Sequence, residues 1–115
     1  MTASGPVPEA LEKLLAKGTD NALLRMGLAL ACQRRGELER ARGHVEQALL
    51  HQPGFAAAGR LRGLIALEQG EPTLAAEAFA QALDAAQRQG ERQLERELAV
   101  RLKRLQPPAS TAHTK

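Results

Sequence analysis

Histidine is the first side chain to consider as a site of chemistry, because it binds metals and transfers protons near neutral pH. The sequence has three histidines, His44, His51 and His113, and none has a Glu or a second His at ligand spacing beside it. A zinc site needs three or four ligands that converge on one point. We therefore interpret these residues as surface or helix-end histidines, and we expect no metal site and no cofactor.

Nucleophilic side chains are equally scarce. Cys32 is the only cysteine, which excludes an internal disulfide and a metal site built from clustered cysteines. Its neighbours are apolar and no histidine lies nearby to activate the thiol, so we expect Cys32 to be a buried hydrophobic side chain. The only serines, Ser4 and Ser110, lie in the outermost segments, where a serine triad would have no framework.

The acidic residues near the C-terminal end do not suggest catalysis either. Glu91, Glu95 and Glu97 alternate with Arg92 and Arg96, which is typical of a solvated helix face with local ion pairs. Paired carboxylates that work as acid and base need a pocket, and a phosphate-binding glycine loop needs a preceding strand. The sequence indicates neither, and we predict that the protein is not an enzyme.

The composition indicates which elements position these residues. Hydrophobic residues make up 43% of the 115 residues, Ala and Leu dominate them, and Phe55 and Phe79 are the only aromatics. Ala and Leu are strong helix formers, whereas the residues that favour strands are nearly absent. The chain length allows one domain. We therefore predict a single all-α domain.

Charge and hydropathy limit the classes of partner. The net charge is +3 with both signs interspersed, which is too mild to indicate nucleic acid by itself. We find no secretory signal and no apolar run near the roughly 20 residues that a membrane-spanning helix needs. We expect a cytoplasmic protein, and the Ala- and Arg-rich composition is typical of a GC-rich bacterial genome.

Glycine and proline divide the chain into helical segments. Pro8 suits a first helical turn, Gly18, Gly36 and Gly70 suit helix ends, and Thr19 or Asp20 is expected to cap the second helix. The predicted helices are 9–17, 21–35, 38–51, 55–69, 72–89 and 91–105. Such short links between helices make sequence neighbours antiparallel.

The pattern of these segments repeats every 34 residues. Gly36-Glu37 recurs as Gly70-Glu71, and Gln47-Ala48-Leu49 recurs as Gln81-Ala82-Leu83. Three single positions obey the same offset, which relates Leu30 to Leu64, Ala41 to Ala75 and Val45 to Phe79. Unrelated helices would not keep one register through both helix and turn, so the two halves are structural repeats.

A 34-residue helix–turn–helix period with small residues at the helix contacts resembles the tetratricopeptide repeat (TPR) family. The matching residues are Leu28, Ala29, Gly36, Ala41, Val45, Ala48 and Pro53, and then Gly63, Gly70, Ala75, Phe79 and Ala82. The chain departs from the family pattern at its two aromatic positions: the first holds Arg25 and Gly59, and the second holds Cys32 and Ala66. Gln87 stands where the family pattern has a proline.

The resemblance implies antiparallel helix pairs that stack into a short right-handed superhelix of about six helices. We expect repeats at 22–55 and 56–89 and flanking helices at 9–17 and 91–105, all within one domain, 8–105. The flanking helices would close the two ends, with Arg92, Arg96 and Arg104 on the outer side of the last one. We expect a flexible tail at 1–7 and a disordered one at 106–115.

In this family the first helices of the repeats line a concave groove that holds ligands. The resemblance therefore points to a partner-binding groove made by Leu23, Met26, Leu30, Arg60, Leu64, Leu67, Leu94, Leu98 and Arg101. Segment 21–35 is apolar on nearly every side, and such a helix needs cover on every side. The flanking helices, a helix or extended segment of a partner, or a second copy of the chain would each supply that cover.

The favoured function is a protein–protein interaction module, an adaptor or a co-chaperone-like protein, in which Arg60 and Arg101 are polar anchors. The groove positions carry no Lys or Asn, so we do not expect the clamp by which some relatives hold a C-terminal carboxylate. One alternative is a homodimer through the same groove. Another is nucleic-acid binding through the basic C-terminal residues Arg88, Arg92, Arg96, Arg101, Lys103 and Arg104, although no aromatic residue there could stack on bases.

Overall fold

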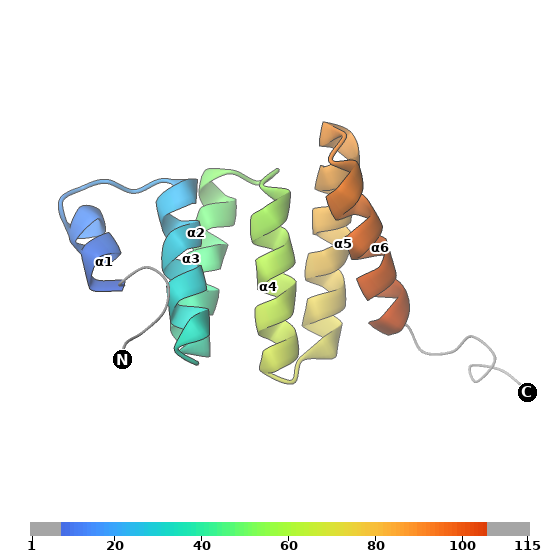
Figure 1. The fold of residues 1–115 in the computed structure, drawn as a ribbon, viewed down its shortest axis with the longest axis horizontal. Coiled ribbons are helices and arrows are strands. Elements are labelled where there is room, and N and C mark those ends of the chain that lie inside the picture. The colour runs from blue at the N-terminus through green and yellow to red at the C-terminus, as the bar shows by residue number, and fades with distance from the viewer. Residues whose placement is uncertain (1–7, 106–115) are drawn as a thin grey trace, which may run out of the picture.

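A computed structural model describes residues 8–105, which form six α-helices in a row (Figure 1). The helices are α1 (Pro8–Ala16), α2 (Ala22–Arg34), α3 (Leu38–His51), α4 (Ala56–Glu68), α5 (Pro72–Gln89) and α6 (Arg92–Leu105). Each agrees with a predicted helix to within one residue at either end, and the predicted all-α helical repeat fold is confirmed. The tails at 1–7 and 106–115, predicted to be flexible and disordered, lie outside the described residues.

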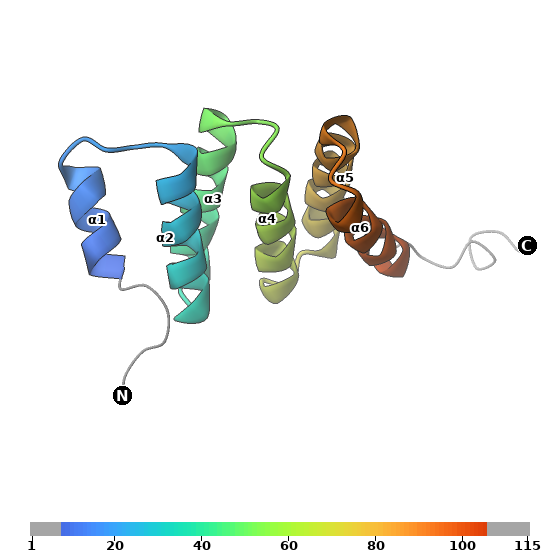
Figure 2. The same ribbon diagram turned by 45° about the horizontal axis from the view of Figure 1, so that its top comes forward.

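The helices form two antiparallel pairs with a single helix at either end. Helix α2 pairs with α3 and α4 pairs with α5, and these are the most extensive helix contacts in the part of the chain that the structure describes. Helix α1 packs on α2, and α6 packs on both α5 and α4. The first helices α2, α4 and α6 also touch one another in sequence order (Figures 1 and 2). No described helix is long and apolar enough to cross a membrane.

The repeated glycines end the first helix of each pair in the same way. Gly36 and Gly70 have φ angles of 78° and 76°, in the left-handed region that a residue with a Cβ rarely enters. The next residue in each case, Glu37 or Glu71, donates its backbone N–H back across the turn to Cys32 or Ala66. This turn reverses the chain sharply, and it makes the second helix antiparallel to the first.

The N-terminal cap of α2 differs from the prediction. Asn21, not Thr19 or Asp20, caps the helix, and its side-chain oxygen accepts a hydrogen bond from the backbone N–H of Leu24 at 2.8 Å. The reason is that α2 begins at Ala22, so the residue directly before it holds the capping position. The carboxylate of Asp20 binds Arg25 and His51 instead.

Two clusters of buried side chains make up the core, and α4 contributes to both. The first cluster lies among α2, α3 and α4 and comprises Ala29, Cys32, Ala41, Val45, Ala48, Ala58, Leu61 and Ile65. The second lies among α4, α5 and α6 and comprises Ala56, Ala66, Ala75, Phe79, Ala82, Ala86 and Leu98. Residues related by the 34-residue offset, such as Val45 and Phe79, are fully buried in successive clusters.

Helices α4 and α5 approach so closely that two positions on α4 leave no room for a side chain. A Cβ added at Gly63 would lie 2.3 Å from Cε1 of Phe79, and a Cβ at Gly59 would lie 2.8 Å from that of Ala82. Both distances are well below van der Waals contact. The expectation that Gly63 permits a close helix pair is therefore met, and Phe79 fills the space that the glycine leaves.

The two end helices are held differently. On α1, Leu11 lies against Gly27 of α2, and Glu9 and Glu12 form ion pairs with Arg35 and Arg40. Helix α6 is held instead by a stripe of four leucines that face the second core cluster: Leu94, Leu98, Leu102 and Leu105. Its basic outer residues Arg92, Arg96 and Arg104 are exposed, as expected for a helix that closes the end of a stack.

A polar network joins the start of α2 to α3. The guanidinium of Arg25 donates to both carboxylate oxygens of Asp20, at 2.8 and 3.0 Å, and its Nη1 lies 3.1 Å from Nδ1 of His44. Nε2 of His51 lies 2.9 Å from the same carboxylate. The hydrogen bond from Arg25 is the main reason that the pKa of Asp20 falls to about 2. Burial, and then the charge of Arg25, lower the pKa of His44.

The close contact at Gly63 gives a first test. Gly63→Ala should lower the free energy of unfolding by up to about 2 kcal/mol, because overpacking costs about 1–3 kcal/mol and Ala restores only about 1 kcal/mol of helix propensity. Gly43→Ala is the matched control, since nothing lies within 4 Å of its added Cβ. It should raise stability by about 0.5–1 kcal/mol. Denaturant unfolding followed by far-UV circular dichroism measures both; equal stabilisation by the two changes would contradict the α4–α5 packing.

The network around His44 predicts how stability depends on pH. Because the folded-state pKa of His44 lies below its ordinary value of 6.5, the unfolded chain binds more protons in the interval between the two values. The contribution of His44 to the free energy of unfolding is therefore complete above pH 6.5 and is lost as the pH falls towards the folded-state pKa. Thermal melts at a series of pH values should show a melting temperature that declines on acidification, and this decline should be smaller in His44→Gln. His51→Gln, which keeps His44, should retain the decline; an unchanged decline in His44→Gln would refute the assignment.

Candidate functional site

The residues that could do chemistry do not form a reactive centre in the described part of the chain. No group of three or more His, Cys, Asp or Glu side chains is placed to hold a metal ion there. Cys32 is fully buried in the first core cluster, as expected, and burial raises the pKa of its thiol.

The predicted groove residues lie along α2, α4 and α6, on what we call the first-helix face: Leu23, Met26, Leu30, Arg60, Leu64, Leu67, Leu94 and Arg101. Leu23 is 74% exposed and Leu67 is 36% exposed. Met26, Leu30, Leu64 and Leu94 are half-buried, because they also pack against the core clusters. Apolar surface thus remains open on this face, most of all at its two exposed leucines.

Leu98 does not belong to this open surface. Its side chain is fully buried in the second core cluster, so the prediction that it contacts a partner is wrong for this structure. The 34-residue offset makes Leu98 equivalent to Leu30 and Leu64, but within residues 8–105 no second helix pairs with α6 as α3 pairs with α2 and α5 with α4. Helix α6 packs on α5 and, less extensively, on α4 (Figure 2). Its leucine stripe faces the second core cluster.

The two predicted polar anchors are already paired with a carboxylate. Glu97 accepts a hydrogen bond from Nε of Arg60 at 2.6 Å and another from Nε of Arg101 at 2.8 Å. Arg101 also lies over the ring of Phe79, 5.9 Å from its centroid. Glu97 neutralises one of their two charges, so the predicted anchors form one cluster with a single net positive charge.

Glu97 is a site residue that the sequence interpretation missed. Burial raises its pKa, but the hydrogen bonds from Arg101 and Arg60 outweigh that effect, so the pKa lies below its ordinary value. The carboxylate is thus ionised at neutral pH, and the cluster of two arginines and one glutamate carries one net positive charge. Its spacing of four residues before Arg101 is a helix ion-pair signal that could have identified it.

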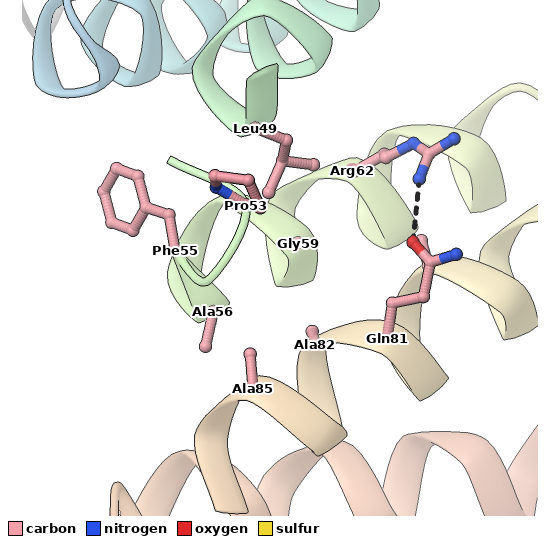
Figure 3. Close-up of a pocket in the computed structure, with 10 residues that line it drawn as sticks. Leu49, Pro53, Phe55, Ala56, Gly59, Arg62, Gln81, Ala82 and Ala85 are labelled. Carbon is pink, nitrogen blue, oxygen red and sulfur yellow. Dashed lines mark hydrogen bonds between the residues drawn. The ribbon is translucent and has the colours of Figure 1, made fainter. Parts of the chain in front are cut away.

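A hollow lies between α3, α4 and α5 (Figure 3), and none of the predicted groove residues lines it. It has a volume of about 210 Å³ and is lined by Leu49, Pro53, Phe55, Ala56, Gly59, Arg62, Ala78, Gln81, Ala82 and Ala85. Small side chains at Ala78, Ala82 and Ala85, spaced as one face of α5, leave this space open. On its rim, Arg62 donates to the side chain of Gln81 at 3.3 Å.

The hollow continues along the second helices. One extension reaches Leu50, which is 73% exposed, and Glu46 on α3. Another follows α5 past Asp84 and Arg88. The sequence interpretation placed the binding surface on the first helices and missed this second-helix hollow. The signal was present in the run of alanines on one face of α5, because side chains this short leave a hollow beside the close α4–α5 contact.

The basic residues proposed as a nucleic-acid site do not act as one group. Arg88 pairs with Asp84, and Arg101 pairs with Glu97 on the inner side of α6. The other four residues are exposed on α6, and none has a carboxylate within 4.0 Å among the residues that the structure describes; they are Arg92, Arg96, Lys103 and Arg104. The basic surface is therefore narrower than the sequence suggested.

Comparison with known proteins places this architecture. No protein-family model matches the chain. Over 97 residues the chain is 39% identical to a TPR repeat-containing protein of Pseudomonas aeruginosa, with 84% of this chain and 92% of that protein covered. A solution structure of a protein from Bordetella parapertussis is similar with a TM-score of 0.76 and 35% sequence identity, over 89% of each chain. With the 34-residue repeats and their glycine contacts, these likenesses show that the chain belongs to the tetratricopeptide repeat family.

Proposed function

We propose that the chain is a protein-binding module that holds a helix or an extended segment of a partner on its first-helix face, as an adaptor or co-chaperone-like protein of the bacterial cytoplasm. Membership of the TPR family supports a role in protein–protein interaction in general. The relative from Pseudomonas aeruginosa supports a bacterial setting. The choice of surface rests on the geometry.

The observation that carries this choice is the open apolar surface on adjacent first helices. Leu23 on α2 and Leu67 on α4 leave 74% and 36% of their surfaces exposed, and the half-buried Leu30 and Leu64 lie on the same two helices. Full burial of one exposed leucine side chain contributes about 1.5–3 kcal/mol. Leu23 can gain most of this amount when a partner covers it, whereas Leu67, already largely buried, can gain about a third of it. Together they supply part of the free energy of a specific complex.

The paired arginines make the two ends of the first-helix face chemically different. The cluster formed by Arg60, Glu97 and Arg101 lies at the α4–α6 end and carries one net positive charge, whereas the α2 end is apolar. The side chains of Arg60 and Arg101 are 36% and 29% exposed, so a partner's carboxylate can reach them. A bound segment would place its apolar residues towards α2 and an acidic residue towards α6.

The proposal predicts that replacing exposed leucines on the first helices weakens partner binding, whereas replacing an exposed leucine on a second helix does not. The double change Leu23→Gln/Leu67→Gln should weaken partner binding by at least about tenfold, whereas Leu50→Gln should leave it unchanged. Leu50 is the matched control because it is 73% exposed, like Leu23, but lies on α3 beside the second-helix hollow. Glutamine is neutral and forms helices well, so it adds no charge near a helix end.

The measurement starts from partners that the immobilised wild-type protein captures from a bacterial lysate and that mass spectrometry identifies. Each purified partner is then titrated against the three proteins, and thermal melts check that the variants remain folded. If Leu50→Gln removes binding and the double change does not, the partner occupies the second-helix hollow and the first-helix proposal is wrong. Light scattering decides the homodimer alternative, because a dimer that only the double change dissociates would make this face a self-association surface.

A further inference from the structure

The outer side of α6 is a basic surface that no other described helix covers. At 100° per residue, Arg92, Arg96, Ala99, Val100 and Lys103 fall within an arc of about 100°. All five side chains are exposed, and Val100 leaves 49% of its surface open. The leucine stripe of α6 lies on the opposite side and packs into the second core cluster. Helix α6 thus has one apolar inner face and one basic outer face.

The repeat offset shows what this outer side lacks. Gly59 and Ala66 on α4 are buried, and Gly59 lies directly against Ala82 of the paired helix α5. The equivalent positions on α6, 34 residues later, are Gln93 and Val100, and both are exposed. On α4, the second helix of the pair, α5, covers this surface. In the described part of the chain no helix covers the equivalent surface of α6.

The charges of this surface lack partners as well. No carboxylate lies within 4.0 Å of Arg92, Arg96, Lys103 or Arg104 among residues 8–105. The acidic residues nearest to them in sequence that form no ion pair are Glu91 and Glu95. Most arginines before α6 do have a carboxylate partner; these are Arg25, Arg35, Arg40, Arg42, Arg60 and Arg88. Unneutralised positive charge is therefore concentrated on one helix.

We propose that the outer face of α6 docks an acidic amphipathic helix of a partner protein, in the place that the second helix of a third repeat would occupy. Val100 and Ala99 would contact the apolar stripe of that helix, and the four cations would pair with its Asp and Glu side chains. This surface is separate from the first-helix face, because Leu94 and Arg101 lie on the opposite side of α6.

Charge favours this occupant over the others. A second copy of the chain would bring an identical row of cations against the first, and like charges repel. Residues 1–7 and 106–115 contain no Asp or Glu, so these segments of the chain supply no complementary charge. A single-stranded nucleic acid would bring the negative charge, but α6 has no aromatic side chain on which a base could stack. An acidic helix matches both the cations and the exposed valine.

The test uses a fluorescent peptide of Glu and Leu, about 18 residues long, with Leu at every third or fourth position so that the helix has one apolar stripe. Fluorescence anisotropy measures its affinity for the full chain at about 0.05 M and about 0.15 M salt. Arg96→Glu/Lys103→Glu should weaken binding at least about tenfold. Lys13→Glu/Lys17→Glu, an equal charge change at exposed residues by α1, should alter it by less than about twofold.

Three comparisons can overturn the proposal. A peptide of the same composition with its leucines dispersed around the helix should bind at least about fivefold more weakly; equal binding would mean that charge alone acts. Equal loss of affinity in the Lys13/Lys17 variant would mean that net charge rather than α6 determines binding. A single-stranded oligonucleotide of equal charge should bind more weakly than the peptide at the higher salt concentration. Tighter binding of the oligonucleotide would make this face a nucleic-acid surface.

Discussion

The packing of Phe79 against the backbone of Gly63 is the contact on which the rest of the structure depends. Because Gly63 has no side chain, the ring of Phe79 packs directly against the backbone of α4, within the second core cluster. The same ring lies under the guanidinium of Arg101, and Leu98 of α6 is buried in the same cluster. One missing side chain thus sets the spacing of a helix pair and, through it, the position of the helix that closes the stack.

The three surfaces of the molecule follow from how its helices are paired. The first helices retain exposed leucines because their side chains are only partly covered by neighbours in the stack. The second-helix hollow exists because alanines of α5 meet the small residues of α4. The outer side of α6 stays open because no other described helix packs on it, and its exposed side chains are mostly basic. Each surface offers a different chemistry, and they lie on different sides of the same rigid stack.

Periodicity in the sequence predicts equivalent backbone positions, and it does so well for this chain. Helix ranges, the glycine turns and the buried pair Val45 and Phe79 all follow from the 34-residue offset and the helix-forming composition. Side-chain environment does not follow from the offset, because it depends on neighbours that are not repeated. Leu98 is buried although Leu30 is not, and Glu97 stands where the earlier repeats have Ala29 and Gly63. That single carboxylate accepts hydrogen bonds from both arginines that the sequence analysis predicts as polar anchors.

Helix α4 belongs to both core clusters, so neither repeat has a hydrophobic core that it could keep if the other were lost. In long repeat arrays, stability is close to a sum over neighbouring units, and the ends can unfold while the middle persists. Here the shared helix ties the two units into one cooperative transition. A ligand that binds anywhere on the folded stack therefore protects all of it from unfolding, and hydrogen exchange would slow in α2 and α3 even when the contact is made at α6.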